Sequence, residues 1–224
     1  MVTFVPCAMA TAVGGKATFS GNATVNSDGI FFNDSGANVT NPFVPGSPDT
    51  ADYSGLTGGT IQNLVGPAMT GAVSIPDFVT FNVAEGTIHF DLTKVEPGVG
   101  TAAGCLSSAI GSVCTPANSP FTLIQTSANA VAITLTLDGR AWIGSSNPSS
   151  AAVGAFTTQD VAIGKIPNIL QTILSGGSVR DTYSASFISS PPTRQGEVPE
   201  PATLVLMGVG LLGAGLVARR KATK

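Results

Sequence analysis

The sequence predicts an all-β body, a β-sandwich or jelly-roll-like domain over residues 15–190 that contains one short helix. Three observations favour this fold class. Apolar and polar residues alternate in about nine to eleven short segments, and Gly, Pro, Asn and Ser lie between these segments. Only 10% of the residues are charged, whereas Ser, Thr and Gly together make up about a third of the chain. Thr and Ser then occupy the solvent-facing positions of the expected strands.

The clearest strands lie in the middle of the chain. Residues 79–83 and 88–92 both alternate, and the segment 84–86 between them ends in glycine, which predicts a hairpin. Residues 131–137 alternate as well, and Asp138-Gly139 after them predicts a turn into a further strand over 140–143, because Asp-Gly is a strong hairpin signal. The remaining predicted strands are 17–20, 30–32, 60–65, 121–126, 153–159 and 179–188.

Residues 167–174 depart from this alternation. Apolar side chains recur there at helical spacing from Ile166 to Leu174, with Pro167 at the beginning and glycines at 176–177. We therefore expect a short amphipathic helix that covers one end of the sandwich.

Two cysteines, Cys105 and Cys114, enclose a loop of eight residues. In an oxidising compartment we expect them to form a disulfide. Free thiols and a metal site are the alternatives. A metal site needs two more ligands, and the only histidine, His89, lies on an expected strand among apolar neighbours.

The basic residues gather at one end of the sequence. Arg219, Arg220, Lys221 and Lys224 follow the uncharged, largely apolar segment 202–218. As a helix this segment spans about 25 Å, which is the short end of what a bilayer core needs. We predict a transmembrane helix in 202–224 with a basic cytoplasmic tail. A buried core helix is the alternative, but such a helix would have a polar face.

The motif Val198-Pro199-Glu200-Pro201 stands directly before this span. Together, the Pro-Glu-Pro triplet, the Gly- and Leu-rich span and the terminal basic cluster resemble the PEP-CTERM sorting signal of Gram-negative, exopolysaccharide-producing bacteria. The resemblance covers residues 198–224. It implies processing by exosortase, a membrane-embedded enzyme, with Pro199, Glu200 and Pro201 as the recognition element and Arg219, Arg220 and Lys221 as the cytoplasmic stop.

The resemblance also implies where the protein goes. Export requires a signal peptide, and residues 1–14, which include the small-x-small sequence Ala8-Met9-Ala10, suit the remnant of one. The Pro-rich segment 191–201 is expected to be a linker. The protein would be anchored in the inner membrane through 202–218 until exosortase processes it. It would then remain at the cell surface or in the extracellular matrix.

The sequence of the body contains few residues that suit a catalytic or cofactor-binding site. A catalytic dyad or triad would have to use His89, and nothing selects one pair among the thirteen acidic residues, so we expect no enzyme and no cofactor. The net charge of −3 argues against a nucleic-acid partner. The acidic segments 26–29 and 49–52 are compatible with calcium binding, but they are also ordinary turn sequences.

Two functions remain. The preferred one is a structural or adhesive role in an exopolysaccharide or biofilm context, with exopolysaccharide as a possible partner. The alternative is a carbohydrate-binding or carbohydrate-active body with the same anchor. Exposed aromatic residues would support carbohydrate binding, and Tyr53, Trp142 and Tyr183 are the obvious candidates. We expect Trp142, however, to belong to the core.

Overall fold

The computed structural model describes residues 11–32, 40–66, 70–144, 146, 148–158 and 164–191. These residues belong to the compact unit Met1–Pro192. The predicted linker from residue 192 onward, the predicted transmembrane segment 202–224 and residues 1–10 of the predicted signal-peptide remnant lie outside the described residues. Residues 11–14, which we assign to the same remnant, pair and pack with the body: Thr11–Ala12 forms a strand, and Val13 is fully buried.

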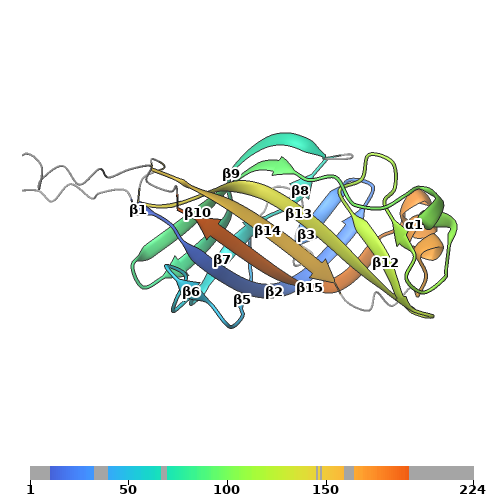
Figure 1. The fold of residues 1–224 in the computed structure, drawn as a ribbon, viewed down its shortest axis with the longest axis horizontal. Coiled ribbons are helices and arrows are strands. Elements are labelled where there is room, and N and C mark those ends of the chain that lie inside the picture. Colours follow the sequence, from blue (N-terminus) through green and yellow to red (C-terminus); the bar gives the residue numbers. More distant parts are fainter. Residues whose placement is uncertain are drawn as a thin grey trace, which may run out of the picture. The chain divides into compact units, whose positions relative to one another are not determined.

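In the described part of the chain, fifteen strands form one sheet, and every strand pair in it is antiparallel. Figure 1 shows the arrangement of the long strands β2, β13, β14 and β15. The first eight are β1 (Thr11–Ala12), β2 (Gly15–Asn26), β3 (Gly29–Phe32), β4 (Thr40–Pro42), β5 (Val44–Pro45), β6 (Thr50–Ala51), β7 (Gly58–Gln62) and β8 (Leu64–Val65). The others are β9 (Gly71–Val83), β10 (Gly86–Val95), β11 (Val113–Cys114), β12 (Thr122–Ser127), β13 (Ala130–Ile143), β14 (Ser150–Thr158) and β15 (Val179–Ser190). Two helices complete the described elements, the 3-10 helix η1 (Ala103–Leu106) and the α-helix α1 (Ile166–Leu174).

The sheet curls around a single main core. Its strand order is β4-β7-β9-β10-β13-β14-β15-β2-β3-β8, and β5 also pairs with β2. Because β4 and β5 are separated by Phe43 alone, the segment 40–45 joins β7 to β2 and brings the two sides of the sheet together. The prediction of an all-β body with one short helix is therefore confirmed, but one curled sheet replaces the two facing sheets of a sandwich. Long twisted strands such as β13, with 14 residues, allow this curvature.

Aromatic side chains fill the curled sheet. Phe187 of β15 is fully buried, and its ring contacts those of Phe19, Phe81, Phe90 and Phe156, with centroid distances between 4.7 and 5.7 Å. These rings come from β2, β9, β10 and β14, so residues far apart in the sequence meet in one cluster. Edge-to-face contacts add to the burial energy of such a cluster.

The predicted hairpin over 79–92 is confirmed. β9 and β10 pair through Val83 and Gly86, and the two residues Ala84 and Glu85 form the turn. Gly86 has a φ of 139°, which side chains with a Cβ rarely adopt. The glycine at this position therefore fixes the place of the turn.

The predicted turn at Asp138-Gly139 is wrong, because β13 runs through both residues without interruption. Gly139 is buried, and a Cβ at this position would collide with the ring of Phe90 on the neighbouring strand β10. The glycine therefore makes room for an aromatic side chain and does not form a turn. Local turn chemistry was overruled by packing between strands.

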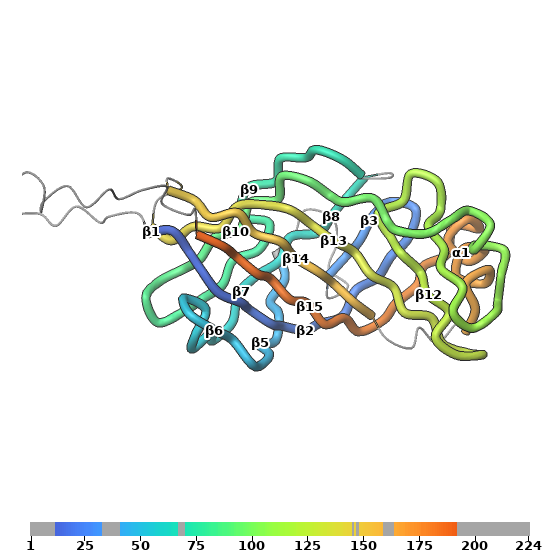
Figure 2. The backbone as a smooth tube through the Cα atoms, viewed as in Figure 1, coloured from blue at the N-terminus to red at the C-terminus, as the bar shows by residue number. Residues whose placement is uncertain are grey.

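The predicted helix is confirmed as α1, which begins one residue earlier than expected. Pro167 lies in its first turn, and buried Gln125 accepts a hydrogen bond from the N–H of Ile166 at 3.1 Å. Ile166 and Ile169 are buried, and α1 packs next to η1 and β12 at one end of the curled sheet (Figure 2). Neither described helix combines the length and the apolar character that a membrane crossing requires.

Candidate functional site

The only histidine lies on the outer face of the sheet, next to a bulge in β9. The pairing of β9 with β10 shifts around Asp77, which has a φ of 50°. An oxygen of Asp77 lies 2.7 Å from Nδ1 of His89, and the N–H of Asp77 donates to Asp91 at 2.8 Å. The indole of Trp142 stacks on the His89 ring with centroids 5.2 Å apart. A His–Asp pair is present, but the group stacked on the imidazole is an indole and not a nucleophile.

The structure corrects the expectation that Trp142 belongs to the core. Because β13 is uninterrupted, its alternation continues through Leu137, Gly139 and Ala141, whose side of the strand is buried. Trp142 consequently points to the opposite face and is half-buried. Together Asp77, His89 and Trp142 form a patch that we call the outer-face patch.

Two carboxylates meet where β10 ends beside β13. The side chains of Glu96 and Asp138 are hydrogen-bonded to each other, and Lys94 Nζ lies 2.5 Å from Glu96 Oε1. The hydrogen bond from Lys94 holds the pKa of Glu96 below its usual range. The bond to Glu96, with burial as a smaller cause, raises the pKa of Asp138. Glycosidases separate their two carboxyl groups by about 5 Å or more to place a sugar between them, so a pair in direct contact does not suit that reaction.

In the predicted acidic loops, side-chain oxygens accept hydrogen bonds from backbone N–H groups of the protein itself. Asp49 accepts from the N–H of Thr18 at 2.8 Å, and Asp52 accepts from the N–H of Gly14 at 2.7 Å. Asn26 accepts from the N–H of Asp28 at 2.8 Å within the turn between β2 and β3. These carboxylates and amides hold turns and neighbouring strands in place. Across the described ranges, no cluster of three or more His, Cys, Asp or Glu side chains is arranged to hold a metal ion.

A disulfide joins Cys105 in η1 to Cys114 in β11. Both cysteines are buried in a second apolar cluster that also includes Ile166 and Ile169 of α1. Closing a loop of this length lowers the conformational entropy of the unfolded chain, and this stabilises the folded state by about 2–3 kcal/mol. The disulfide thus ties the η1–β11 segment to the end of the sheet that α1 covers.

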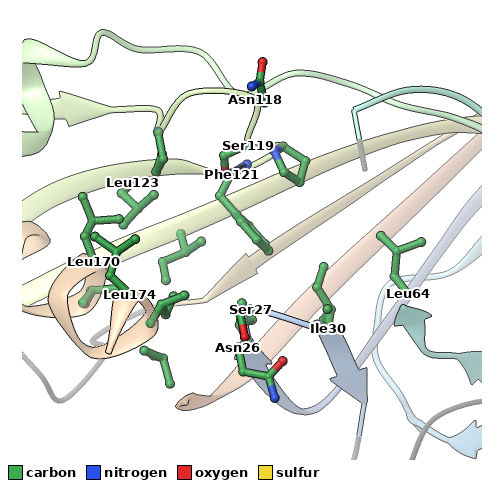
Figure 3. Close-up of a pocket in the computed structure, with 18 of the residues that line it drawn as sticks. Asn26, Ser27, Ile30, Leu64, Asn118, Ser119, Phe121, Leu123, Leu170 and Leu174 are labelled. Carbon is green, nitrogen blue, oxygen red and sulfur yellow. Dashed lines mark hydrogen bonds between the residues drawn. The ribbon is translucent and has the colours of Figure 1, made fainter. Parts of the chain in front are cut away.

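An apolar cavity of about 290 Å³ opens at this end of the sheet (Figure 3). We call it the outer chamber. Leu170 and Leu174 of α1 lie on one side of it, Ile30 and Leu64 on another, and the ring of Phe121 points into it (Figure 3). None of its lining residues is charged. Sequence reasoning missed this cavity, because its walls come from segments scattered between residues 25 and 179 and each segment alone resembles an ordinary core or turn sequence.

A second, smaller cavity of about 40 Å³ lies inside the curled sheet. We call it the inner chamber. The two chambers share lining residues, among them Val25, Phe121 and Val179, so they are neighbours. Thr158, Asp181 and Tyr183 line the inner chamber only.

Both tyrosines are buried and cannot offer the exposed ring that carbohydrate binding would use. Tyr53 is fully buried, and its hydroxyl is hydrogen-bonded to that of Ser189 at 3.0 Å. Burial raises the pKa of Tyr53 to about 12 and also raises the pKa of Tyr183. The hydroxyl of Tyr183 has no hydrogen-bond partner within the part of the chain that the structure describes.

Alkaline conditions are expected to destabilise the protein between about pH 10 and pH 12. The pKa of Tyr53 is about 12 in the folded state and 10.0 in the unfolded state. The stabilisation that comes from burying the neutral phenol is therefore fully present below pH 10 and is lost as the pH rises through 12. This loss amounts to about 2–3 kcal/mol. Urea unfolding between pH 8 and pH 12 should therefore show a steeper decline for the wild type than for Tyr53→Phe. Parallel curves for the two proteins would contradict this assignment.

The predicted sorting residues Val198, Pro199, Glu200 and Pro201 and the basic residues Arg219, Arg220 and Lys221 lie outside the described residues. Residues 197–221 match the family model of the PEP-CTERM protein-sorting motif, which confirms the resemblance seen in the sequence. This motif implies export, anchoring in the membrane before cleavage, and exosortase as the processing partner. No curated protein and no solved structure matches the chain.

Proposed function

We propose that this chain is an exported, non-enzymatic protein with a structural or adhesive role at the cell surface or in the extracellular matrix, in an exopolysaccharide context. The observation that carries the proposal is the sorting motif over 197–221. A body delivered by such a signal must remain folded outside the cell without a reducing environment. The disulfide between Cys105 and Cys114 suits that compartment.

The arrangement of polar groups supports a role without catalysis. The pair formed by Glu96 and Asp138 and the pair formed by Asp77 and His89 both lie outside the linings of the two described chambers. The lining of the outer chamber is mostly apolar, whereas a sugar-processing cleft needs several polar groups that converge on the hydroxyls of its substrate.

The outer-face patch favours carbohydrate binding as a second candidate, through which an adhesive role would be exerted. Trp142 is half-buried on the outer face, and Asp77 and His89 lie directly beside it. An aromatic ring flanked by polar groups can stack on the apolar face of a sugar while neighbouring groups bond to its hydroxyls. Tyr53 cannot provide a second aromatic ring for stacking on a sugar, because it is buried in the core.

Co-sedimentation with exopolysaccharide tests the adhesive role. The exported protein, isolated from its producing cells, is mixed with exopolysaccharide purified from the same cells, and the bound fraction is measured. We expect the wild type to sediment with the polysaccharide and Trp142→Ala to bind at least about tenfold less. Val153→Ala, on the exposed side of β14, is the matched control and should bind like the wild type. Lack of binding by the wild type would eliminate the adhesive role.

A further inference from the structure

The loop between β10 and β12 exposes large apolar side chains at the α1 end of the sheet. Leu106, the last residue of η1, is 86% exposed, and Ile110 in the turn that follows is 69% exposed. η1 packs against α1, whose last residue, Leu174, is 83% exposed. Figure 2 shows this loop, in green, beside α1 at one end of the sheet. We call Leu106, Ile110 and Leu174 the apolar tip.

The fold restrains the loop that carries most of the apolar tip. The disulfide between η1 and β11 closes it, and the hydroxyl of Ser112 donates to that of Ser107 at 2.7 Å. The N–H of Gly111 donates to the backbone oxygen of Gln125 in β12 at 2.8 Å. A loop restrained in this way loses little further conformational entropy when a partner covers it. The exposed side chains are thus presented in a fixed arrangement.

The charge distribution around the apolar tip favours a lipid surface over a protein partner. Segments 97–137 and 166–179 contain no charged residue. Protein interfaces use charged groups to steer a partner and to fix its orientation, whereas a surface that enters a bilayer must avoid burying charge. Both segments therefore suit contact with lipid. They also lack the cluster of basic residues that binds anionic headgroups.

The outer chamber extends this apolar surface into the body. Leu174 belongs both to the apolar tip and to the lining of the chamber, and none of the other lining residues is charged. Water in an apolar cavity finds few hydrogen-bond partners. Hydrocarbon that covers Leu174 therefore removes apolar area from water at the tip and at the opening of the chamber together.

We propose that the apolar tip is a membrane-contact site, which inserts Leu106, Ile110 and Leu174 into the surface of a bilayer whose headgroups carry no net charge. Apolar side chains that enter the boundary between headgroups and acyl chains gain the free energy of burial. The contact holds the α1 end of the body at a membrane. It goes beyond the proposed function and does not depend on it, so the failure of either leaves the other untouched.

Flotation with phosphatidylcholine vesicles tests this proposal. The exported protein is mixed with the vesicles, and the fraction that floats with them is measured. We expect the affinity of the wild type to change less than about twofold between about 50 and 500 mM salt, because charge pairing does not contribute. Leu106→Asp combined with Ile110→Asp should bind at least about tenfold more weakly, since two apolar groups are lost and two charges are added.

A matched double variant controls for the added charge. Val153 and Ile188 stand opposite each other on β14 and β15 and are 46% and 54% exposed. Val153→Asp combined with Ile188→Asp should float like the wild type. Leu174→Asp, on a different element from the loop, should weaken binding in the same direction as the tip variant. Absence of wild-type binding, or equal binding by the wild type and the tip variant, would overturn the proposal.

Fluorescence quenching locates the contact, even where another part of the chain also holds lipid. Trp142 is the only tryptophan, so Ile110→Trp combined with Trp142→Phe carries a single reporter at the tip. Brominated acyl chains should quench this reporter, because interfacial side chains reach about 5–10 Å into the boundary region. The reporter in Val153→Trp combined with Trp142→Phe should stay unquenched. Equal quenching of the two reporters would contradict insertion through the tip.

A second copy of the chain is the competing occupant of the apolar tip. Sedimentation velocity without lipid measures the self-association of the wild type and of the tip variant. We expect both to be monomers, which leaves the tip free for a membrane. A wild-type dimer that Leu106→Asp combined with Ile110→Asp dissociates would assign the tip to a second copy and overturn the membrane contact.

Discussion

Phe187→Ala is expected to lower the free energy of unfolding by about 3–5 kcal/mol. The ring is fully buried at the centre of the aromatic cluster and contacts rings from four other strands. Gly154 on the neighbouring strand leaves the space that this ring occupies, since a Cβ there would collide with it. Because surrounding strands are fixed by their hydrogen bonds, the cavity left by the substitution should collapse only in part.

The adjacent residue provides the control for this effect. Ile188 lies on the opposite face of β15 and is 54% exposed, so Ile188→Ala should cost about 1 kcal/mol or less. Urea unfolding of the two variants and the wild type at neutral pH measures the difference. Similar losses for both substitutions would contradict the inward orientation of Phe187.

Replacing Pro199-Glu200-Pro201 with three alanines is expected to abolish processing. The motif match over 197–221 implies that exosortase acts on this segment, and alanine lacks the proline rings that restrict the backbone. In the variant, full-length protein should accumulate in the membrane fraction, and the mature form should disappear. Mass spectrometry of the mature C-terminus and cell fractionation provide the measurements.

Two further samples make this experiment decisive. Alanine in place of Pro191, upstream of the matched residues, should leave processing unchanged and controls for a general effect on the linker. The wild-type chain in a host that lacks exosortase should resemble the triple-alanine variant. If its molecular mass and localisation instead match those in the normal host, the sorting assignment is wrong.

Elements that rest on local patterns were predictable from the sequence. The hairpin at 84–86 and the helix α1 combine periodicity with glycine or proline at the correct end. The closure of the sheet was not predictable, because segment 40–45 is short, contains two prolines and pairs with strands on either side of it. Asp138-Gly139 carries a turn signal that the close approach of β10, through the ring of Phe90 and the backbone oxygen of Asp91, overrules.

The candidate sites differ in the same way. The sorting motif is contiguous, so its order and spacing are visible in the sequence alone. The two chambers depend on distant segments that only the folded sheet brings together. The two tyrosines illustrate the difference. The hydroxyl of Tyr53 bonds to Ser189, whereas that of Tyr183 has no partner among the described residues, and the sequence pattern of their surroundings does not reveal which is which.

The position of β15 has a mechanical consequence. This strand ends at Ser190, directly before the predicted linker; it pairs with β2 over residues 179–189 and with β14 over residues 183–190. Tension that enters through Pro191 while the body is held at the α1 end would load both ladders in shear, with many hydrogen bonds resisting at once. A chain leaving from an edge strand would instead be peeled away one bond at a time. The pairing of β15 on both sides therefore resists a pull applied at the C-terminal end of this strand.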